Sequence, residues 1–256
     1  MTAARQGTVY LVGAGPGDPE LLTVKAARLL ASADVVLHDD LVPAAVLGEA
    51  RGALIINVGK RCGRKNISQE QINGMMVEYA RRGMAVIRLK SGDPLIFGRA
   101  GEEMDALRAA GVAFEVVPGI TAAFAAAAAL GRALTDRRSA SKIEFSAGQH
   151  AHGSRDEAQR SVAATRVIYM PGRDLGRLAE QLRGEGLSGD LPCVLVSRAG
   201  QPEQQVVETA LENLERTGAL PAPMILLVGE ALRDGQVDTP GEVVTVADEN
   251  AVPMQA

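Results

Sequence analysis

Apolar residues follow two alternating patterns through the first half of the chain. Short uninterrupted apolar runs predict buried strands, at 8–14, 34–38, 53–58, 85–90 and 113–117. The stretches between them carry apolar positions at helical spacing and predict helices, at 20–32, 43–50, 69–82 and 100–110. Strands that are joined by helices favour right-handed crossovers, so we expect a largely parallel sheet here.

The second half has a different pattern. The alanine-rich segment 121–131 predicts a tightly packed helix, because Ala is the best helix former and Gly131 can end it. Further strands and one helix are predicted, the strands at 142–148, 165–172, 191–200, 204–211 and 223–229 and the helix at 174–184. Two of these strands follow one another closely, so this sheet should be partly antiparallel.

These patterns predict an α/β protein of two α/β domains, a mostly parallel one and a mixed one. We expect an N-terminal domain at 1–118, a C-terminal domain at 119–242 and a tail at 243–256, with one edge strand after Asp234. The active-site cleft is expected between the domains and beyond the carboxyl ends of the parallel strands, where α/β proteins usually bind ligands.

Composition excludes several classes of function. The net charge of −4 gives no overall attraction to nucleic acid or anionic membranes, and only 3% aromatic residues disfavours stacking on RNA bases. No long apolar run or signal peptide is evident, so a cytoplasmic location is expected. Cys62 and Cys193 lack a metal-binding spacing, and His150 and His152 lie in a polar stretch, so we expect no metal.

The first strand and its turn, VYLVGAGPGDPELLT at residues 9–23, suggest a dinucleotide-binding loop. A pyrophosphate needs free backbone N–H groups at the helix start, yet Pro16 and Pro19 have none and Asp18 adds negative charge. Asp39 stands where a ribose-binding acid would lie, which favours the dinucleotide interpretation. An oxidoreductase of this class therefore stays an alternative.

Several loops at predicted strand ends are rich in Gly, Pro and charge. They read GAGPGDP (13–19), HDDLV (38–42), GKRCGRKNIS (59–68), LKSGDPLIFGR (89–99), PGITA (118–122) and YMPG (169–172). With these motifs in order, the chain resembles the tetrapyrrole (precorrin) methylase family over residues 7–233. Its GKRxG…SQxxIN, RLKxGDPxIFGRxGEE and VVPGIT motifs are most similar to those of members that methylate uroporphyrinogen III.

The resemblance implies transfer of methyl groups from S-adenosylmethionine to ring carbons of a tetrapyrrole. We expect two successive methylations of uroporphyrinogen III, at C2 and C7, giving precorrin-2 for sirohaem or cobalamin synthesis. The alternatives are a methylase of the same family that acts on a later precorrin, the oxidoreductase above and a binding module without catalysis. The resemblance and the small side chains of 121–130 also imply a homodimer.

The resemblance assigns the cofactor contacts to loop residues of both halves, namely Pro16, Ser91, Gly92, Asp93, Ile96, Thr121, Ala122, Met170, Ala199 and Met224. Close backbone approach suits Gly92, and a carboxylate such as Asp93 suits a cationic ligand. A thioether such as Met170 packs well on an adenine face, although plain core filling explains Met170 equally well.

Four residues are candidates for catalysis. Asp39, at the end of the second strand, is the expected base that removes the ring proton, and Lys60 is by resemblance a proton donor or carboxylate anchor. Arg99 is expected to bind substrate carboxylates with Glu102 holding it, because i,i+3 residues share a helix face; a plain surface ion pair is the alternative.

Two basic clusters suit a substrate with eight carboxylates, namely Lys60, Arg61, Arg64 and Lys65, and Arg132, Arg137, Arg138 and Lys142. A solvated basic face is the alternative explanation. Lys65 and Asp136 stand where related uroporphyrinogen enzymes often carry His.

Overall fold

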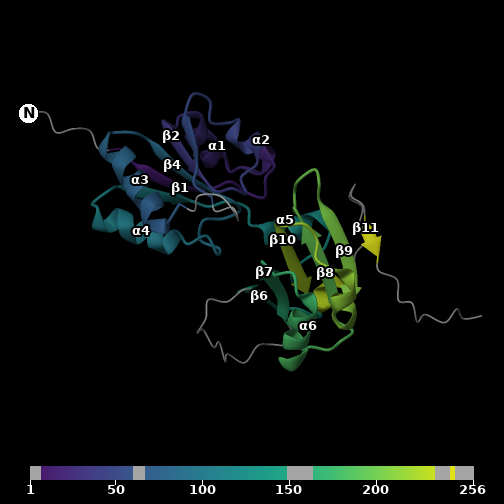
Figure 1. The fold of residues 1–256 in the computed structure, drawn as a ribbon. Coiled ribbons are helices and arrows are strands. Elements are labelled where there is room, and N and C mark those ends of the chain that lie inside the picture. Colours follow the sequence, from purple (N-terminus) through teal and green to yellow (C-terminus); the bar gives the residue numbers. More distant parts are fainter. Residues whose placement is uncertain (1–6, 60–66, 149–163, 234–242, 246–256) are drawn as a thin grey trace, which may run out of the picture. The chain divides into compact units, whose positions relative to one another are not determined.

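The computed structural model describes residues 7–59, 67–148, 164–233 and 243–245, and the chain divides into two compact units, residues 1–122 and 123–256 (Figure 1). Each unit is built on one β-sheet. Among the described residues, none of the helices is long and apolar enough to cross a membrane.

Unit 1 contains a five-stranded parallel sheet in the order β3-β2-β4-β1-β5. Its strands are β1 (Val9–Gly13), β2 (Val35–His38), β3 (Leu54–Asn57), β4 (Val86–Lys90) and β5 (Phe114–Val117). The parallel sheet predicted from the alternating strands and helices is confirmed. Every residue of β2 and β4 is buried, as expected for strands inside a sheet that is covered on both faces.

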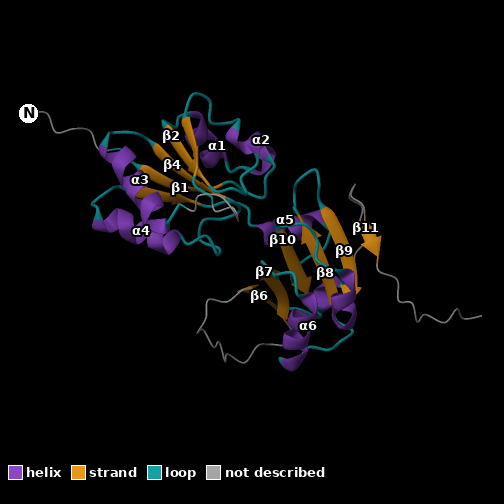
Figure 2. Ribbon diagram, in the orientation of Figure 1, coloured by secondary structure: helices purple, strands orange, loops and turns teal. Residues whose placement is uncertain are grey.

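Four α-helices cover the two faces of this sheet (Figure 2). They are α1 (Val24–Ala31), α2 (Ala44–Leu47), α3 (Gln69–Arg81) and α4 (Ala100–Ala109). On one face, α1 and α2 pack through Leu30 and Val46 against Ile87 and Leu89. On the other, α3 and α4 pack through residues such as Met76 and Leu107 against the opposite side chains of β1, β2 and β4.

The predicted helix at 20–32 is wrong at its start. Pro19–Leu21 forms a short 3-10 helix, and Asp18 caps it by accepting the backbone N–H of Glu20 at 2.9 Å. A new cap at Thr23 then starts α1. The helix predicted at 43–50 is likewise shorter, because α2 ends at Leu47 before Gly48. Both corrections lie beside Pro or Gly, which restrict or release the backbone.

Unit 2 contains a six-stranded mixed sheet in the order β11-β9-β8-β10-β7-β6. Its strands are β6 (Lys142–Ala147), β7 (Ala164–Tyr169), β8 (Pro192–Ser197), β9 (Gln205–Ala210), β10 (Met224–Val228) and β11 (Val243–Thr245). The predicted antiparallel pairing of β8 with β9 is confirmed, and the edge strand predicted after Asp234 is β11, which runs parallel to β9.

The helices of unit 2 are α5 (Ala122–Ala129) and α6 (Leu175–Gly184), with 3-10 helices η2 (Leu211–Thr217) and η3 (Glu230–Leu232). The main core packs α6 and η2 against one face of the sheet. The sequence did not predict η2, whose run LENLERT places Leu211 and Leu214 three residues apart and buries both. A spacing of three matches the 3-10 turn.

Candidate active site

The carboxyl ends of all five parallel strands of unit 1 lie at one edge of the sheet. The register pairs Gly13 with Lys90, and His38 with Leu89 and Asn57. The Gly- and Pro-rich loops that follow these strands therefore start side by side. This is the edge at which parallel α/β sheets bind their ligands.

Three of these loops approach so closely that only glycine fits. A Cβ on Gly13 would lie 2.5 Å from the backbone N of Gly119 and 2.6 Å from the carbonyl oxygen of Gly92. The loops are also joined by hydrogen bonds, since Gly15 and Gly92 exchange N–H···O bonds of 3.2 and 2.8 Å. The loops after β1, β4 and β5 therefore pack backbone against backbone, and we call this junction the cradle.

The structure gives Asp93 contacts that the sequence does not reveal. One carboxylate oxygen accepts the N–H of Leu95 at 2.8 Å and the other accepts the N–H of Gly119 at 3.0 Å. The side chain thus joins the loop after β4 to the loop after β5. Gly92 has Thr121 and Ala122 next to it, so these predicted cofactor residues are brought together.

A pocket of about 180 Å³ opens at the same edge, beside β2 and β4. We call it the β2–β4 pocket, and it is lined by Asp39, Val58, Gly59, Gln69, Ile72, Arg88, Lys90, Phe97, Gly98 and Arg99. Two predicted catalytic residues, Asp39 and Arg99, therefore share one pocket. Its lining includes three cationic side chains and one carboxylate, which suits an anionic ligand.

A buried charge cluster forms the wall of the β2–β4 pocket. Glu103, which is completely buried, accepts hydrogen bonds through Oε1 from Arg88 Nε at 2.9 Å and from Lys90 Nζ at 3.1 Å. Arg88 also pairs with Asp39, whose side chain keeps 32% of its surface exposed. The carboxylate that the sequence singles out is therefore held by a buried arginine while it stays open to the pocket.

The burial of this cluster changes the two cations in opposite directions. Burial lowers the pKa of Arg88, but the charges of Asp39 and Glu103 outweigh it and raise the pKa above its ordinary value. For Lys90, burial and then repulsion from Arg88 lower the pKa below its ordinary value, against the attraction of Asp39 and Glu103.

Arg99 and Glu102 form the predicted pair at the start of α4. Two parallel bonds of 2.7 Å join Nε to Oε1 and Nη2 to Oε2, and both side chains are about half exposed. The hydrogen bonds to Glu102 raise the pKa of Arg99. The two-point contact fixes the plane of the guanidinium, so its remaining N–H groups face outward in a defined direction.

In unit 2 the predicted cofactor residues also gather at one edge of the sheet. Met224 begins β10 and pairs with Ser197, the last residue of β8, and Ile225 pairs with Tyr169, the last residue of β7. Met170 and Ala199 follow those two strands, so they lie at the same edge as Met224. Met170 is 51% exposed, whereas Met224 packs on the core.

Residues with left-handed backbone conformation occur both at the β2–β4 pocket and at the edge of the unit 2 sheet that carries Met170 and Ala199. Among the described non-glycine residues, a positive φ occurs at Phe97, Arg99, Met170 and Arg198. Phe97 and Arg99 line the β2–β4 pocket, and Arg198 directly precedes Ala199. Such conformations cost about 1–3 kcal/mol each and cluster at functional sites.

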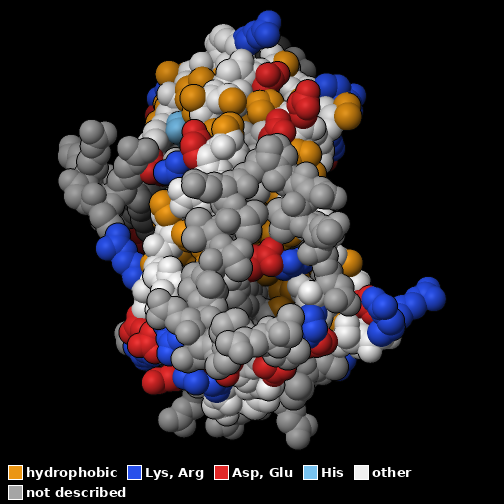
Figure 3. All heavy atoms as spheres, turned by 90° about the vertical axis from the view of Figure 1, so that its right-hand side faces the viewer, with side chains coloured by type: hydrophobic (Ala, Val, Ile, Leu, Met, Phe, Trp, Pro, Cys, Tyr) orange, Lys and Arg blue, Asp and Glu red, His pale blue; other side chains and the backbone are white. Residues whose placement is uncertain are grey.

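The predicted basic clusters fare differently. Lys60, Arg61, Arg64 and Lys65 lie outside the described residues. Arg132 is buried and donates a hydrogen bond of 2.8 Å to Glu208. Arg138 forms an ion pair with Asp136, and its hydrogen bonds lower the pKa of that carboxyl to about 2. On the face that Figure 3 presents, acidic and basic side chains are intermixed.

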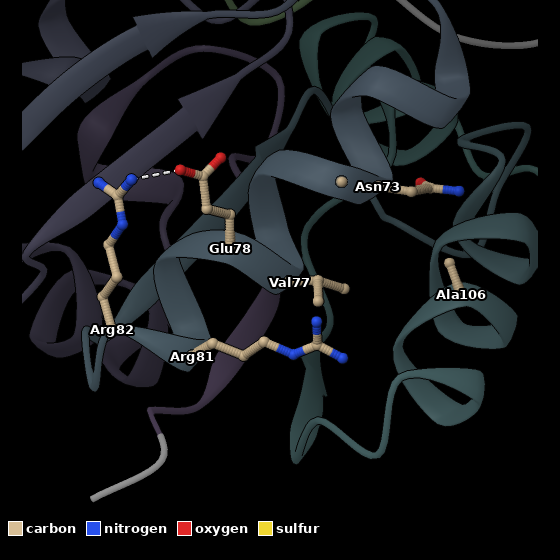
Figure 4. Close-up of a pocket in the computed structure, with 7 residues that line it drawn as sticks. Asn73, Val77, Glu78, Arg81, Arg82 and Ala106 are labelled. Atoms are coloured by element: carbon tan, nitrogen blue, oxygen red, sulfur yellow. Dashed lines mark hydrogen bonds and ion pairs between the residues drawn. The ribbon is translucent and has the colours of Figure 1, made fainter. Parts of the chain in front are cut away.

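A second, larger hollow of about 550 Å³ lies along α3 (Figure 4). Arg81 extends below Val77, whereas Arg82 turns away and pairs with Glu78. None of the predicted site residues lines this hollow. It therefore provides control positions rather than a candidate active site.

Sequence reasoning missed Arg88, Lys90 and Glu103 as individual residues. A signal was available, because two cations stand two residues apart on the otherwise apolar strand AVIRLK. Strands at the centre of a parallel sheet normally form continuous apolar runs. Two cations on one face of such a strand indicate a buried acidic partner or a ligand.

No group of three or more potential metal ligands occurs among the described residues, and the expectation of no metal stays a prediction.

Comparisons with known proteins give the family. The sequence-family model of the tetrapyrrole (corrin/porphyrin) methylases matches residues 8–215 of this chain. A sirohaem synthase of Acinetobacter baylyi is 44% identical over 90% of this chain and 52% of its own length. The chloroplastic S-adenosyl-L-methionine-dependent uroporphyrinogen III methyltransferase of Arabidopsis thaliana is 42% identical over 88% of this chain and 64% of its own.

A solved structure of uroporphyrin-III C-methyltransferase from Thermus thermophilus, complexed with S-adenosylhomocysteine, matches 89% of this chain and 99% of its own with a TM-score of 0.78 and 39% identity. The chain spans about half the length of the sirohaem synthase. The family model spans the sheet of unit 1 with its carboxyl-edge loops, and unit 2 as far as β9. The chain belongs to the tetrapyrrole methylase family.

Proposed function

We propose that the protein is an S-adenosylmethionine-dependent C-methyltransferase that converts uroporphyrinogen III to precorrin-2 by methylation at C2 and C7. The observation that carries the proposal is the β2–β4 pocket, in which Asp39 and Arg99 meet two buried cations. The names of the relatives support the same substrate.

S-adenosylmethionine would supply an electrophilic methyl group: a ring carbon forms the new C–C bond, the C–S bond breaks and S-adenosylhomocysteine leaves. The cradle of Gly13, Gly92 and Gly119 suits such a ligand, because the close backbone packing of its three loops brings the assigned residues to one edge of the sheet. We assign binding in unit 1 to Pro16, Ser91, Gly92, Asp93, Ile96, Thr121 and Ala122. We assign binding in unit 2 to Met170, Ala199 and Met224.

Asp93 serves this site by fixing the loops, since its two oxygens accept N–H groups from the loops after β4 and β5. A carboxylate so engaged still places negative charge near the cradle. That charge favours a ligand with a cationic sulfonium and amino group.

For the tetrapyrrole, we assign binding to Arg99, held flat by Glu102, and removal of the ring proton to Asp39. Arg88 orients Asp39, as a base must lie within hydrogen-bond reach of the proton that it takes. Lys60 keeps its assignment as a proton donor or carboxylate anchor and lies outside the described residues.

The test is an anaerobic assay with uroporphyrinogen III and labelled S-adenosylmethionine, followed by mass analysis of the tetrapyrrole. We expect one and then two methyl groups on the product. A chain that methylates a later precorrin and leaves uroporphyrinogen III unchanged would be the other family member. Binding of NADH with no methyl transfer would favour the oxidoreductase.

We also propose that the predicted domains 1–118 and 119–242 correspond to the two compact units.

We propose in addition that the protein forms a homodimer. The small side chains of α5 do not provide the interface, because Ala123, Ala125, Ala126 and Ala127 are already buried within the chain. Phe124 and Phe145, which contact each other and stay partly exposed, are better candidates. Light scattering that shows a monomer at micromolar concentration would exclude the dimer.

A further inference from the structure

We propose that Lys90 is a substrate-binding residue whose ammonium group, anchored by Glu103 in the wall of the β2–β4 pocket, binds a carboxylate of the tetrapyrrole. The inference rests on the proposed function and adds a residue to it. Lys90 and Glu103 both lie within the RLKxGDPxIFGRxGEE motif, but neither is among the site residues assigned above.

The two cations of the cluster use their donors differently. Arg88 donates to Glu103 through Nε, to the carbonyls of Leu37 and Leu89 at 3.3 Å through Nη1, and to Asp39 through Nη2. These four acceptors hold the guanidinium in place on every side. Arg88 is therefore a structural cation that positions Asp39.

Lys90 is placed differently. An ammonium group has three N–H donors, yet among the described residues Lys90 has one acceptor, Oε1 of Glu103 at 3.1 Å. That oxygen is shared with Arg88 and with Gln69 Nε2 at 3.3 Å. The Lys90 side chain is only 3% exposed, so donors without acceptors destabilise the folded protein unless a ligand supplies those acceptors.

Electrostatics agree with this geometry. The pKa of Lys90 is lowered by burial and by repulsion from Arg88, and the attraction of Asp39 and Glu103 does not offset these two effects. A bound carboxylate would supply both the missing charge and the missing acceptors. Asp39 is the only carboxylate that lines the pocket among the described residues, and it is paired with Arg88.

Gly98 keeps the lysine in this position. A Cβ on Gly98 would lie 3.1 Å from Cε of Lys90 and 2.5 Å from the carbonyl oxygen of Pro94. The loop therefore packs directly on the end of the lysine stem. This contact restricts the ammonium to the region between Glu103 and the pocket.

The test compares Lys90→Met, Glu103→Gln and the double variant Lys90→Met/Glu103→Gln. Each single variant leaves a buried charge unbalanced and is expected to lose thermal stability. The double variant removes one charge of each sign, keeps both side-chain volumes close to the original and should regain most of that stability. It therefore separates folding from substrate binding.

We expect the folded double variant to raise KM for uroporphyrinogen III roughly 10- to 100-fold, the effect of a lost hydrogen bond to a charged group. The turnover number should change much less, and calorimetric affinity for S-adenosylmethionine should stay at the wild-type value. Arg166→Met/Glu185→Gln removes an ion pair of unit 2 in which the arginine is buried, and this control is expected to keep the wild-type KM.

If the double variant has the wild-type KM, Lys90 is only structural and the inference is overturned while the proposed function stands. If the wild-type protein does not methylate uroporphyrinogen III, the proposed function is overturned and the inference with it. A raised KM in both the double variant and the unit 2 control would also overturn the inference, because loss of a buried pair would then suffice.

Discussion

Single glycines determine how closely the loops at the candidate cofactor site approach one another. Gly13 and Gly119 occupy positions where the neighbouring backbone leaves no room for a Cβ, and Gly92 adopts a positive φ of 67° that favours glycine. The motifs quoted from the sequence contain all three, but the sequence alone cannot show that residues 13 and 119 touch. Their contact depends on β1 lying between β4 and β5, which is a property of the whole sheet.

The variant Gly13→Ala should therefore destabilise the protein by about 1–3 kcal/mol, because overpacking displaces backbone atoms. It should also weaken binding of S-adenosylmethionine. Urea denaturation and calorimetry measure the two effects. Gly74→Ala is the control: it lies in α3 with nothing within 4 Å of the added Cβ, and it should stabilise by about 0.5–1 kcal/mol. Equal stability of the two variants would contradict the close contact.

The Cys193 thiol should be unreactive in the folded protein. It is completely buried in the core of unit 2, and burial raises the pKa of the thiol well above its ordinary value. Since the thiolate is the reactive form, iodoacetamide should label the Cys193 peptide only in denaturant, as mass spectrometry can measure. Labelling under native conditions would mean that this core opens readily.

At the residue scale, the sequence singled out Asp39 and Arg99 but not the residues that hold them. Asp39 directly follows β2 and Arg99 directly precedes α4, so both stand in loops that the motifs mark. Arg88 and Glu103 are 15 positions apart and meet only because α4 packs on the face of β4 that carries Arg88. Long-range pairs of this kind leave no local signal beyond a charge inside an apolar strand.

At the scale of elements, strands were predicted better than short helices. Each strand of unit 1 lies inside the run predicted for it, because the parallel strands are short, mainly apolar segments that polar residues and turns separate. The misses are at 19–23, where Asp18 and Thr23 cap two successive turns, and at η2, which is a 3-10 helix. Propensity does not distinguish a short 3-10 turn from the end of an α-helix.

The start of α3 is one element boundary that the sequence did predict. Ser68 accepts the N–H of Gln71 at 3.1 Å, and the Gln71 side chain accepts the N–H of Ser68 at 2.8 Å. Ser68→Ala should cost about 1 kcal/mol, and Ser68→Asp, which keeps a capping acceptor, should retain most of the stability. Chemical denaturation measures both. Equal losses in the two variants would show that the cap does not stabilise α3.

At the scale of the whole molecule, the two kinds of sheet followed from the connections between strands. Helices separate the strands of unit 1 and give parallel pairing, whereas β8 and β9 are joined closely and pair antiparallel. Sequence patterns carry this information because parallel neighbours need a long crossover. Strand order does not follow from such patterns, since β4 inserts between β2 and β1.

Ligand binding should be visible as a change in the stability of the whole chain. S-adenosylhomocysteine at 100 times its Kd should add about 2.7 kcal/mol to the free energy of unfolding and raise the melting temperature. NAD should not, because Pro16, Asp18 and Pro19 leave the turn after β1 without donors for a pyrophosphate, and Asp18 occupies the N–H of Glu20. Equal shifts from the two ligands would contradict the assignment of the cradle.

The most direct test of the account is turnover of uroporphyrinogen III beside calorimetric affinity for S-adenosylmethionine, in the wild type, Arg99→Ala and Glu102→Ala. As an exposed ion pair, these residues should contribute less than about 1 kcal/mol to folding. As the substrate clamp of the β2–β4 pocket, they should be essential for turnover, because a reacting group misplaced by about 1 Å can cost about 10²-fold in rate. We predict that both variants fold, bind S-adenosylmethionine as the wild type does and lose turnover by at least about 10²-fold. Near wild-type turnover in both variants would contradict the assignment of this pocket as the methyl-acceptor site.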